Sequence, residues 1–315
     1  MLPTAASGDI EHAARLLRTG GLVVFPTETV YGLGANALDA AAVARIYAVK
    51  RRPATSPLIV HVASVEMLQS VAEEWPESAK RLASFFWPGP LTFVVKRNSA
   101  IPEIVTAGLS TVAVRMPAHP VAQALIRAAG VPVAAPSANR FTELSPTTAE
   151  HVRRSLGSDV DFILDGGSCQ VGIESTVLSL ADTTPTLLRP GGISRAQLEA
   201  ILGPIASAPE IQSGAHPAPG MHPRHYSPRT ALYMTTDGQL PAGRGIYLQH
   251  RNPPSRASVT IHQMPATPGG YATALYNVLH QADAENYDWI AADLPPATPE
   301  WEAVLDRLRR ASAKP

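Results

Sequence analysis

Three consecutive cations lie where a predicted helix ends, in a segment at residues 50–62 that reads KRRPATSPLIVHV. A helix C-terminus attracts cations, so Lys50 and Arg52 could form no more than a solvated helix end. Pro53 and Pro57, however, stiffen the loop that follows and would hold the two charges in fixed positions. Fixed cations suit the binding of a polyanion. From these residues alone, both interpretations remain open.

A second segment, residues 25–36, reads FPTETVYGLGAN and lies in the first connection between a predicted strand and a predicted helix. It offers the hydroxyl of Thr27, and Gly32 and Gly34 allow a ligand to approach the backbone closely. Ligands of α/β sheets bind near the carboxyl ends of strands, so the position favours a site over an ordinary Thr/Gly turn. The third glycine of a dinucleotide fingerprint is missing, and the chain has no Walker A lysine motif, which disfavours a conventional NAD or P-loop site.

Arginines and small polar side chains also occur at the ends of several later strands. Arg115 comes near the end of an apolar strand, where it needs an anionic partner, either a ligand carboxylate or an internal salt bridge. The other polar residues of this kind are Ser137, Asn139, Ser145, Ser175, Thr176 and Arg189. They could bind a phosphate or a ribose, or cap turns. Because they gather at strand ends, we expect one shared polyanion pocket.

Strand-like and helix-like segments alternate over the first two hundred residues. Helices are predicted at residues 10–19, 39–51, 120–129 and 147–156. Strands are predicted at residues 22–25, 58–62, 91–95, 111–114, 131–135, 162–164, 175–180 and 186–188. The last three strands follow one another with little helix between them. This order predicts an α/β fold with a mixed sheet.

The composition changes at residues 204–228, where six prolines alternate with glycine and serine. Such a segment is typical of a linker. After it, strands are predicted at residues 230–235, 245–249, 259–263 and 289–292, with helices at 270–286 and from Pro299 onwards. We therefore predict a large α/β domain over residues 1–203, a linker over 204–228 and a smaller, Rossmann-like α/β domain over 229–315.

The overall charge balance disfavours a protein held on nucleic acid by electrostatics. Lys+Arg and Asp+Glu both number 26, so the net charge is zero and any anion site must be local. The single cysteine, Cys169, excludes a disulfide framework or a cysteine zinc site within the chain. We see no signal-peptide pattern and no apolar run near the roughly 20 residues of a membrane helix. We expect a cytoplasmic protein with no membrane contact.

Eight motifs resemble, in order, those of the YrdC-domain family. They are PTETVYGLG, the K-x-R of Lys50 and Arg52 with its proline, PLIVHV, PGPLTFVV, the V-R-M-P around Arg115, the S-x-N of Ser137 and Asn139, ESTV and LRPGG. They cover about residues 8–203. A later segment at 220–228, GMHPRHYSP, resembles the linker of the long, two-domain threonylcarbamoyl-AMP synthases. The resemblance implies a twisted mixed-sheet α/β domain with a concave, positively charged cavity.

The activity that this resemblance implies is that of a nucleotidyltransferase. It would make L-threonylcarbamoyladenylate and pyrophosphate from L-threonine, bicarbonate or CO2, and ATP. Threonine's amine would capture bicarbonate or CO2 as a carbamate, and the carbamate would attack the α-phosphate of ATP. Mg²⁺ normally accompanies the nucleotide, and the product passes to a tRNA threonylcarbamoyl transferase. No stable nucleic-acid binding is expected.

Residue by residue, the resemblance implies two adjoining subsites. Around threonine it places Thr27, His61, Arg115, Ala135 and Ser175. Around ATP it places Lys50, Arg52, Ser56, Thr111, Ser137, Asn139, Ser145, Arg189 and Tyr226. Lys50 and Arg52 would position the phosphates and the carbamate for reaction. Ser56 stands where asparagine is often found in this family, although serine can still donate a hydrogen bond.

Two features of the predicted site need the fold to be interpreted. His61 lies inside a predicted strand and could equally be a hydrogen-bonded core histidine. Residues 214–228 are expected to form a lid, held by the C-terminal domain, that excludes water while the labile carbamate reacts.

Three other functions remain possible at this point. The same concave surface could bind double-stranded RNA. A carbamoyl-transfer role in hydrogenase maturation occurs in related domains, but those proteins carry a cysteine-rich zinc region that one cysteine cannot supply. The third possibility is that this chain is an inactive or differently specific relative, but the retained K-x-R and S-x-N motifs favour activity.

Overall fold

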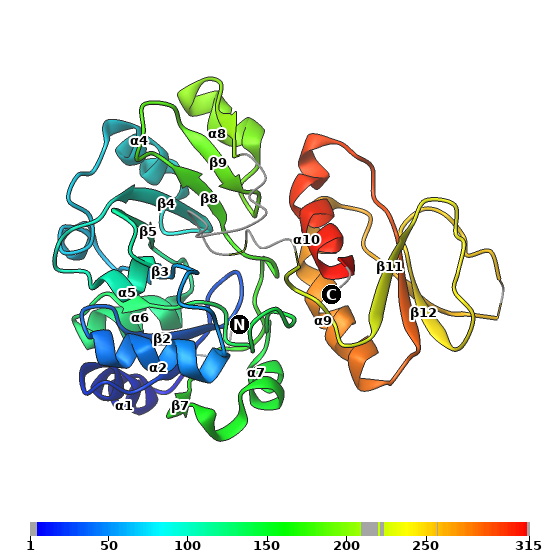
Figure 1. The fold of residues 1–315 in the computed structure, drawn as a ribbon, viewed down its shortest axis with the longest axis horizontal. Coiled ribbons are helices and arrows are strands. Elements are labelled where there is room, and N and C mark those ends of the chain that lie inside the picture. Colours follow the sequence, from blue (N-terminus) through cyan, green and yellow to red (C-terminus); the bar gives the residue numbers. More distant parts are fainter. Residues whose placement is uncertain (1–4, 209–219, 221–223, 257, 314–315) are drawn as a thin grey trace.

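The computed structural model describes residues 5–208, 220, 224–256 and 258–313, and its largest element is a ten-stranded mixed sheet. In spatial order its strands are β10 (Ala206–Ser207), β9 (Thr186–Arg189), β8 (Thr176–Ser179), β4 (Leu91–Lys96), β5 (Thr111–Arg115), β3 (Ile59–His61), β6 (Val133–Ala134), β2 (Gly32–Asn36), β1 (Val23–Phe25) and β7 (Phe162–Ile163). Parallel pairs such as β3–β5 and β4–β8 alternate with antiparallel pairs such as β4–β5 and β8–β9. The predicted mixed sheet is therefore confirmed (Figure 1).

Helices flank this sheet and connect its strands. They are α1 (Ser7–Arg18), α2 (Ala40–Lys50), α3 (Val65–Leu68), α4 (Glu77–Phe86), α5 (Glu103–Thr106), α6 (Pro120–Ala129), α7 (Ala149–Ser155) and α8 (Arg195–Leu202), with a 3₁₀ turn at η1 (Gly157–Asp159). The Asp39 carboxylate accepts hydrogen bonds from two amides of the first turn of α2. Arg51 ends that helix in the left-handed conformation, with φ of 52°. The following residue, Arg52, consequently turns back into the protein, where it is buried.

The strand β2 is the main difference from the expected elements, since its residues were predicted to be a connection. Glycine is rare in strands, so the presence of Gly32 and Gly34 argues against a strand when residue propensities alone are considered. Their role is close packing. A Cβ on Gly34 would lie 2.8 Å from both Phe25 and Val133, so only glycine fits between the neighbouring strands.

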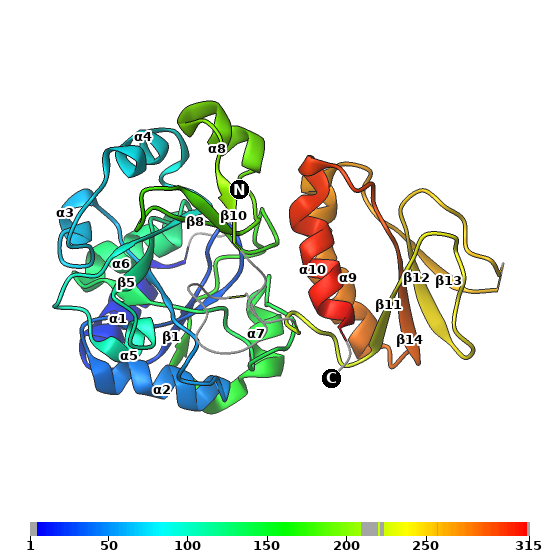
Figure 2. The same cartoon turned by 45° about the horizontal axis from the view of Figure 1, so that its top comes forward.

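A second unit follows, built on a four-stranded sheet in which all neighbouring strands are parallel. Its strands, in order, are β11 (Ala231–Thr235), β14 (Trp289–Asp293), β12 (Gly245–Gln249) and β13 (Thr260–Gln263). Two helices, α9 (Pro268–Ala284) and α10 (Glu302–Ser312), lie between this sheet and the larger unit, and a 3₁₀ turn, η2 (Pro299–Trp301), precedes α10. Figure 2 shows both helices at the boundary. The predicted small α/β unit is confirmed.

The apolar core of the second unit continues across the boundary. Leu248 and Ile290 on the sheet pack with Leu279 and Leu308 on the two helices. The same cluster contains Val30, Leu144 and Ile173 of the larger unit, together with Tyr226. Burial of apolar surface therefore holds the units together, and side chains of α9 and α10 reach the larger unit.

The chain between the two units is only partly described. Strand β10 pairs with β9, so the ten-stranded sheet continues past Gly203 into the segment predicted as a linker. The predicted lid at residues 214–228 lies mostly outside the described residues, which here are Gly220 and 224–228. Within the described parts of the chain, no helix is long and apolar enough to cross a membrane.

Candidate active site

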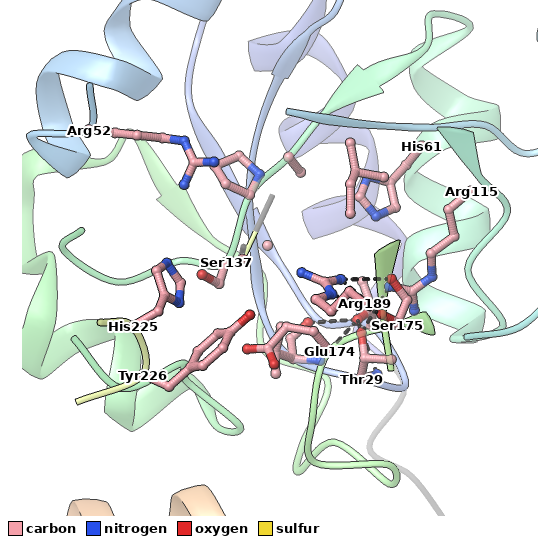
Figure 3. A pocket seen from close by; sticks show the side chains of 17 residues that line it. Thr29, Arg52, His61, Arg115, Ser137, Glu174, Ser175, Arg189, His225 and Tyr226 are labelled. Carbon is pink, nitrogen blue, oxygen red and sulfur yellow. Dashed lines mark hydrogen bonds between the residues drawn. The ribbon is translucent and has the colours of Figure 1, made fainter. Parts of the chain in front are cut away.

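A pocket lies where several strands of the large sheet end, and most of the residues predicted from the sequence line it. The predicted residues found in its lining are Thr27, Arg52, His61, Arg115, Ala135, Ser137, Ser175, Arg189 and Tyr226. Figure 3 shows Arg52 and Tyr226 approaching from one side and His61 and Arg115 from the other. Two cationic walls therefore face a common space.

Sheet topology explains why residues so distant in the sequence meet here. β3 and β5 are parallel neighbours, and their register pairs His61 directly with Arg115 at the last position of each strand. β6 runs antiparallel to β3, with Ala134 opposite Val60, so the chain leaving β6 passes Ile59, and Ala135 and Ser137 join the lining beside it. On the far side, Arg189 ends β9 and donates hydrogen bonds to the backbone oxygen of Ser175, at 2.9 and 3.1 Å.

The guanidinium of Arg115 forms an internal salt bridge, one of the two pairings that the sequence left open. Nη2 lies 2.6 Å from Oε1 of Glu28, and both side chains are buried. Nη1 donates to the hydroxyl of Thr29 at 2.9 Å, and Nε donates to the backbone oxygen of Gly89 at 3.2 Å. Three of the five N–H groups are used, which leaves two for a ligand. Arg115 is thus a fixed cation in the pocket wall.

His61 is a buried, neutral imidazole beside this cation. Burial, and secondly the charge of Arg115, lower its pKa from 6.5 to about 3, so it carries no proton charge at neutral pH. Its ring meets Phe25 edge-on, with centroids 6.0 Å apart. Nδ1 has no hydrogen-bond partner among the described residues. A buried, unpartnered ring nitrogen at a pocket wall is suited to receive a polar group of a ligand.

Arg52 supplies a second buried cation, from the turn that follows α2. It donates to the backbone oxygens of Ser56 and Pro57, at 3.2 and 3.0 Å, and its guanidinium lies 5.5 Å from the centre of the Phe141 ring. Burial lowers its pKa from 12.5 to about 10, so it remains charged at neutral pH. The stiff, proline-containing loop inferred from the sequence provides the two carbonyls that hold it.

Lys50 lies behind the pocket rather than in its lining. Its Nζ donates to the backbone oxygen of Ser137 at 2.5 Å and to that of Asn139. The side chain is buried, and burial, with the nearby charge of Arg52 second, holds its pKa well below the usual range. In this arrangement the ammonium anchors the S-x-N loop, so Lys50 shapes the pocket through Ser137.

Four further residues predicted at the ATP subsite also lie outside the pocket lining. Thr111 begins β5 while Arg115 ends it, and four residues of strand at about 3.3 Å each separate them by roughly 13 Å. Asn139 donates to the backbone oxygens of Arg140 and Glu143, at 2.8 and 2.9 Å. The remaining two are Ser145, which donates to Glu174 at 2.6 Å, and Ser56, whose buried Oγ has no partner among the described residues.

Glu174 is the main pocket residue that sequence reasoning missed. It is buried, and its carboxylate accepts hydrogen bonds from Ser145 (2.6 Å), Tyr276 (3.0 Å) and Arg307 (2.7 Å). Burial alone would raise its pKa, but the charges of Arg307 and Arg189 outweigh burial and hold it below the usual value. The sequence did contain a clue to Glu174, since a carboxylate that follows Val171, Gly172 and Ile173 just before β8 is a candidate for burial. His225, beside Tyr226, also lines the pocket and was not predicted.

The charge balance of the lining suits a polyanion. Its described residues include three arginines, at 52, 115 and 189, and one carboxylate, Glu174. Glu28 balances Arg115 and Arg307 balances Glu174. Arg52 has no salt-bridge partner among the described residues, so it offers a positive charge to the pocket, and in a partly buried site charge–charge attraction is stronger than in water.

Two family models match the chain. A model described as "Telomere recombination" matches residues 15–191, and one described as "Threonylcarbamoyl-AMP synthase, C-terminal domain" matches residues 193–313. The threonylcarbamoyl-AMP synthase of Pyrococcus abyssi is 41% identical over 318 residues, which covers 96% of this chain and 94% of the relative. The enzyme of the same name from Bacillus subtilis is 42% identical over 323 residues, covering 96% of this chain and 92% of the relative.

The fold agrees with these matches. The crystal structure of P. abyssi Sua5 complexed with L-threonine has a TM-score of 0.89 and 40% sequence identity, covering 96% of this chain and 94% of that one. The family resemblance inferred from eight short motifs is therefore confirmed over both units. By its sequence and its fold, this chain belongs to the threonylcarbamoyl-AMP synthase family.

Proposed function

We propose that this protein is an L-threonylcarbamoyladenylate synthase, which uses L-threonine, bicarbonate or CO2, and ATP. The observation that carries the proposal is the pocket at the strand ends, where three arginines meet in a chain of this family. The structure of a relative in complex with L-threonine supports threonine as a substrate. The arginines of the lining support a nucleoside triphosphate as the second substrate.

The reaction needs positioned charge more than a dedicated base. The amine of threonine attacks bicarbonate or CO2 and forms a carbamate, releasing water in the first case and a proton in the second. A carbamate oxygen then attacks the α-phosphate of ATP, the bond to the β-phosphate oxygen breaks, and pyrophosphate leaves. Fixed cations offset the charge that develops at the phosphoryl centre, and a buried pocket keeps water from the carbamate.

For threonine we propose the wall formed by β3, β5 and the chain after β6. Arg115 would bind the carboxylate through its two remaining N–H groups, and neutral His61 would accept a polar hydrogen. The other residues of this proposed subsite are Thr27, Ala135 and Ser175, which line the same pocket. Because His61 stays neutral, it adds no charge beside the carboxylate.

For ATP we propose direct contacts from Arg52, Ser137, Arg189 and Tyr226, which line the pocket, with Lys50 acting through the S-x-N loop. Mg²⁺ would arrive with the nucleotide. Within the described residues no group of three His, Cys, Asp or Glu side chains could hold a metal, and Glu174 is occupied by three donors. Phosphate oxygens, water and a hydroxyl such as that of Ser137 therefore suit Mg²⁺ better than a protein cage.

We further propose a cytoplasmic protein whose product passes to a tRNA threonylcarbamoyl transferase. With Cys169 as its single cysteine the chain forms no internal disulfide, which agrees with a reducing compartment. The relatives are named threonylcarbamoyl-AMP synthases, which supports an activated threonylcarbamoyl group as the product that such a transferase would take up.

The experiment that tests this function supplies purified protein with Mg²⁺, ATP, bicarbonate and radiolabelled threonine, without tRNA. We expect pyrophosphate and labelled threonylcarbamoyl-AMP in equal amounts, and neither product when threonine or bicarbonate is omitted. Folded protein that binds ATP without forming product would overturn the proposal. Binding of double-stranded RNA by such a protein would favour the RNA-binding alternative.

A pair of adjacent arginines provides a matched control. Arg52→Gln removes the buried cation, and loss of one such fixed charge should lower kcat/KM for ATP by about 10²–10³-fold. Arg51→Gln changes the exposed neighbour and should leave kcat/KM within about threefold, as surface substitutions usually do. Equal effects of the two substitutions would contradict the proposed ATP subsite.

A further inference from the structure

Arg307 belongs to the small C-terminal unit, yet its guanidinium lies behind the wall of the pocket. The side chain is fully buried on α10. Nε donates to Glu174 at 2.7 Å, Nη2 donates to the backbone oxygen of Pro190 at 3.1 Å, and Nη1 pairs with Asp306 at 2.5 Å. Each of the first two contacts crosses from the second unit to the first.

The guanidinium also touches the segment between the units. Its central carbon lies 5.0 Å from the centre of the Tyr226 ring, a cation–π distance. Arg307 thus contacts three separate parts of the pocket wall. These parts are Glu174 before β8, the turn of Arg189 and Pro190 after β9, and Tyr226 before β11.

Simple docking of the two units does not account for this arrangement. Burying a guanidinium costs several kcal/mol of desolvation, and a buried ion pair can often be replaced by apolar residues without loss of stability. The surrounding boundary is already apolar, with Val30, Leu144 and Ile173 packed against the second unit. The planar guanidinium donates its hydrogen bonds in fixed directions. It can therefore orient the groups that it binds, which an apolar side chain cannot do.

We propose that Arg307 is a positioning residue for the reaction: it holds the Glu174 carboxylate, the Arg189–Pro190 turn and the Tyr226 ring in place, and so fixes where Arg189 and Tyr226 meet the nucleotide. This inference rests on the proposed function for the identity of the ligand. The small unit supplies a second support in Tyr276, whose hydroxyl donates to the same Glu174 carboxylate at 3.0 Å. The nucleotide side of the pocket is complete only when α9 and α10 are docked.

The threonine side should depend on Arg307 much less than the nucleotide side does, with Ser175, which follows Glu174 and accepts a hydrogen bond from Arg189, as the link between them. Arg115, Glu28, Thr29 and His61 all belong to the large unit, and Arg115 donates its three hydrogen bonds to partners within that unit. Loss of Arg307 should therefore weaken nucleotide binding and the use of ATP while largely sparing threonine binding. A general loss of folding would affect both ligands, so this split separates positioning from a structural role.

The test compares three variants of the full-length protein. Arg307→Met keeps an unbranched side chain but removes the charge and the fork, Arg307→Lys keeps the charge alone, and Arg309→Met is a control on the exposed face of α10. For Arg307→Met we expect kcat/KM for ATP to fall roughly 10- to 100-fold, as misplaced site groups do, with KM for threonine within about twofold. The lysine variant should recover part of the loss, and Arg309→Met should match the wild type.

Two further experiments support this test. A second variant keeps the proposal testable if Arg307→Met fails to fold, and a binding measurement separates the role of Arg307 from the proposed function. Glu174→Gln keeps the size of the side chain, and if Arg307 acts through Glu174, the double variant should be no worse than Arg307→Met. Binding of a non-hydrolysable ATP analogue, measured by calorimetry, requires no turnover. Wild-type protein that forms no product overturns the function, whereas Arg307→Met binding the analogue like Arg309→Met overturns the role of Arg307. Equal losses for threonine and ATP also overturn that role, and wild-type protein that binds no nucleotide overturns both.

Discussion

Two buried arginine–glutamate pairs border the same pocket, and they differ in where their partners come from. Arg115 and Glu28 both belong to the large unit, with 2.6 Å between Nη2 and Oε1. Arg307 and Glu174 belong to different units, with 2.7 Å between Nε and Oε2. The chemistry and the distances are nearly equal. Only the second pair depends on the docking of another unit.

This difference divides the pocket into two halves. The Arg115 pair forms when β5 and the chain after β1 come together, and Thr29 and Gly89 of the same unit complete it. The threonine half is consequently built by one cooperative unit. The nucleotide half needs Arg307 and Tyr276 from across the boundary, so its geometry follows the position of the C-terminal helices.

The largest expected effect comes from breaking the pair within the large unit. Arg115→Met leaves the Glu28 carboxylate buried with the Ala118 amide as its remaining donor among the described residues. Removing one partner of a buried pair costs about 3–5 kcal/mol, so the free energy of unfolding in urea should fall by that amount. The matched control is Arg153→Met, whose pairing with Glu150 is exposed and should matter by at most about 1 kcal/mol. Equal midpoints for the two variants would contradict the comparison.

A smaller effect is expected when the boundary loses one hydrogen bond. Tyr276→Phe keeps the ring of α9 and removes the hydroxyl that donates to Glu174, a bond to a charged group worth about 2 kcal/mol. Amide exchange should quicken in α9 and α10 and stay unchanged in β3 and β5. Tyr287→Phe is the control, because its hydroxyl donates to nearby Glu285 within the small unit. Faster exchange throughout the large unit would show that the two halves do not fold separately.

The division of the pocket also shows what sequence alone can establish. The motifs around Arg52, Arg115 and Arg189 could be placed in one pocket because strand ends in a sheet converge. Arg307 gave no comparable signal, since an arginine in an amphipathic helix usually faces solvent, and its partner Glu174 is 133 residues away. A contact across a domain boundary depends on docking, which local patterns do not encode.

Two other differences have local physical causes. Lys50 was predicted at the ATP subsite from the stiff loop that follows it and from the family resemblance, and the structure places its ammonium against the carbonyls of Ser137 and Asn139, outside the pocket lining. The strand β2 was missed because its glycines serve close packing rather than strand propensity. In both cases a tertiary contact overrides the local preference of the residue.

Acidification should weaken the boundary between the two units. His151 on α7 and His280 on α9 stack with their ring centres 3.9 Å apart, and burial lowers the pKa of both from 6.5. The charged groups around them are Arg154, Arg229 and Asp283. Because the pKa of His151 is about 3 when folded, the unfolded chain binds protons more readily below pH 6.5, and stability falls as the pH drops.

For His151 the expected loss is about 1 kcal/mol at pH 5.5 relative to neutral pH, from about 1.4 kcal/mol per pKa unit, and His280 contributes with the same sign. His280→Gln removes one titrating ring and can keep a hydrogen bond to the Ser145 carbonyl, so its Tm should depend less on pH. His262→Gln, at a partly exposed position on β13, is the control and should keep the wild-type pH dependence. His61, which is also buried with a lowered pKa, makes stability fall on acidification in the same direction, and it is present in both variants. An unchanged slope in His280→Gln would exclude the stacked pair as the cause.

The smallest effect is expected at Ser56, which tests where the pocket ends. Its Oγ is buried without a hydrogen-bond partner among the described residues, and the residue is outside the pocket lining. Ser56→Ala removes an unsatisfied hydroxyl, so stability should stay level or rise by up to about 1 kcal/mol, the lower end of the cost of such a group. KM for ATP should not change, because Arg52 uses the backbone oxygen of residue 56 rather than its side chain. Ser137→Ala, in the lining, is the comparison that should raise KM. A higher KM for Ser56→Ala would extend the nucleotide half to this loop.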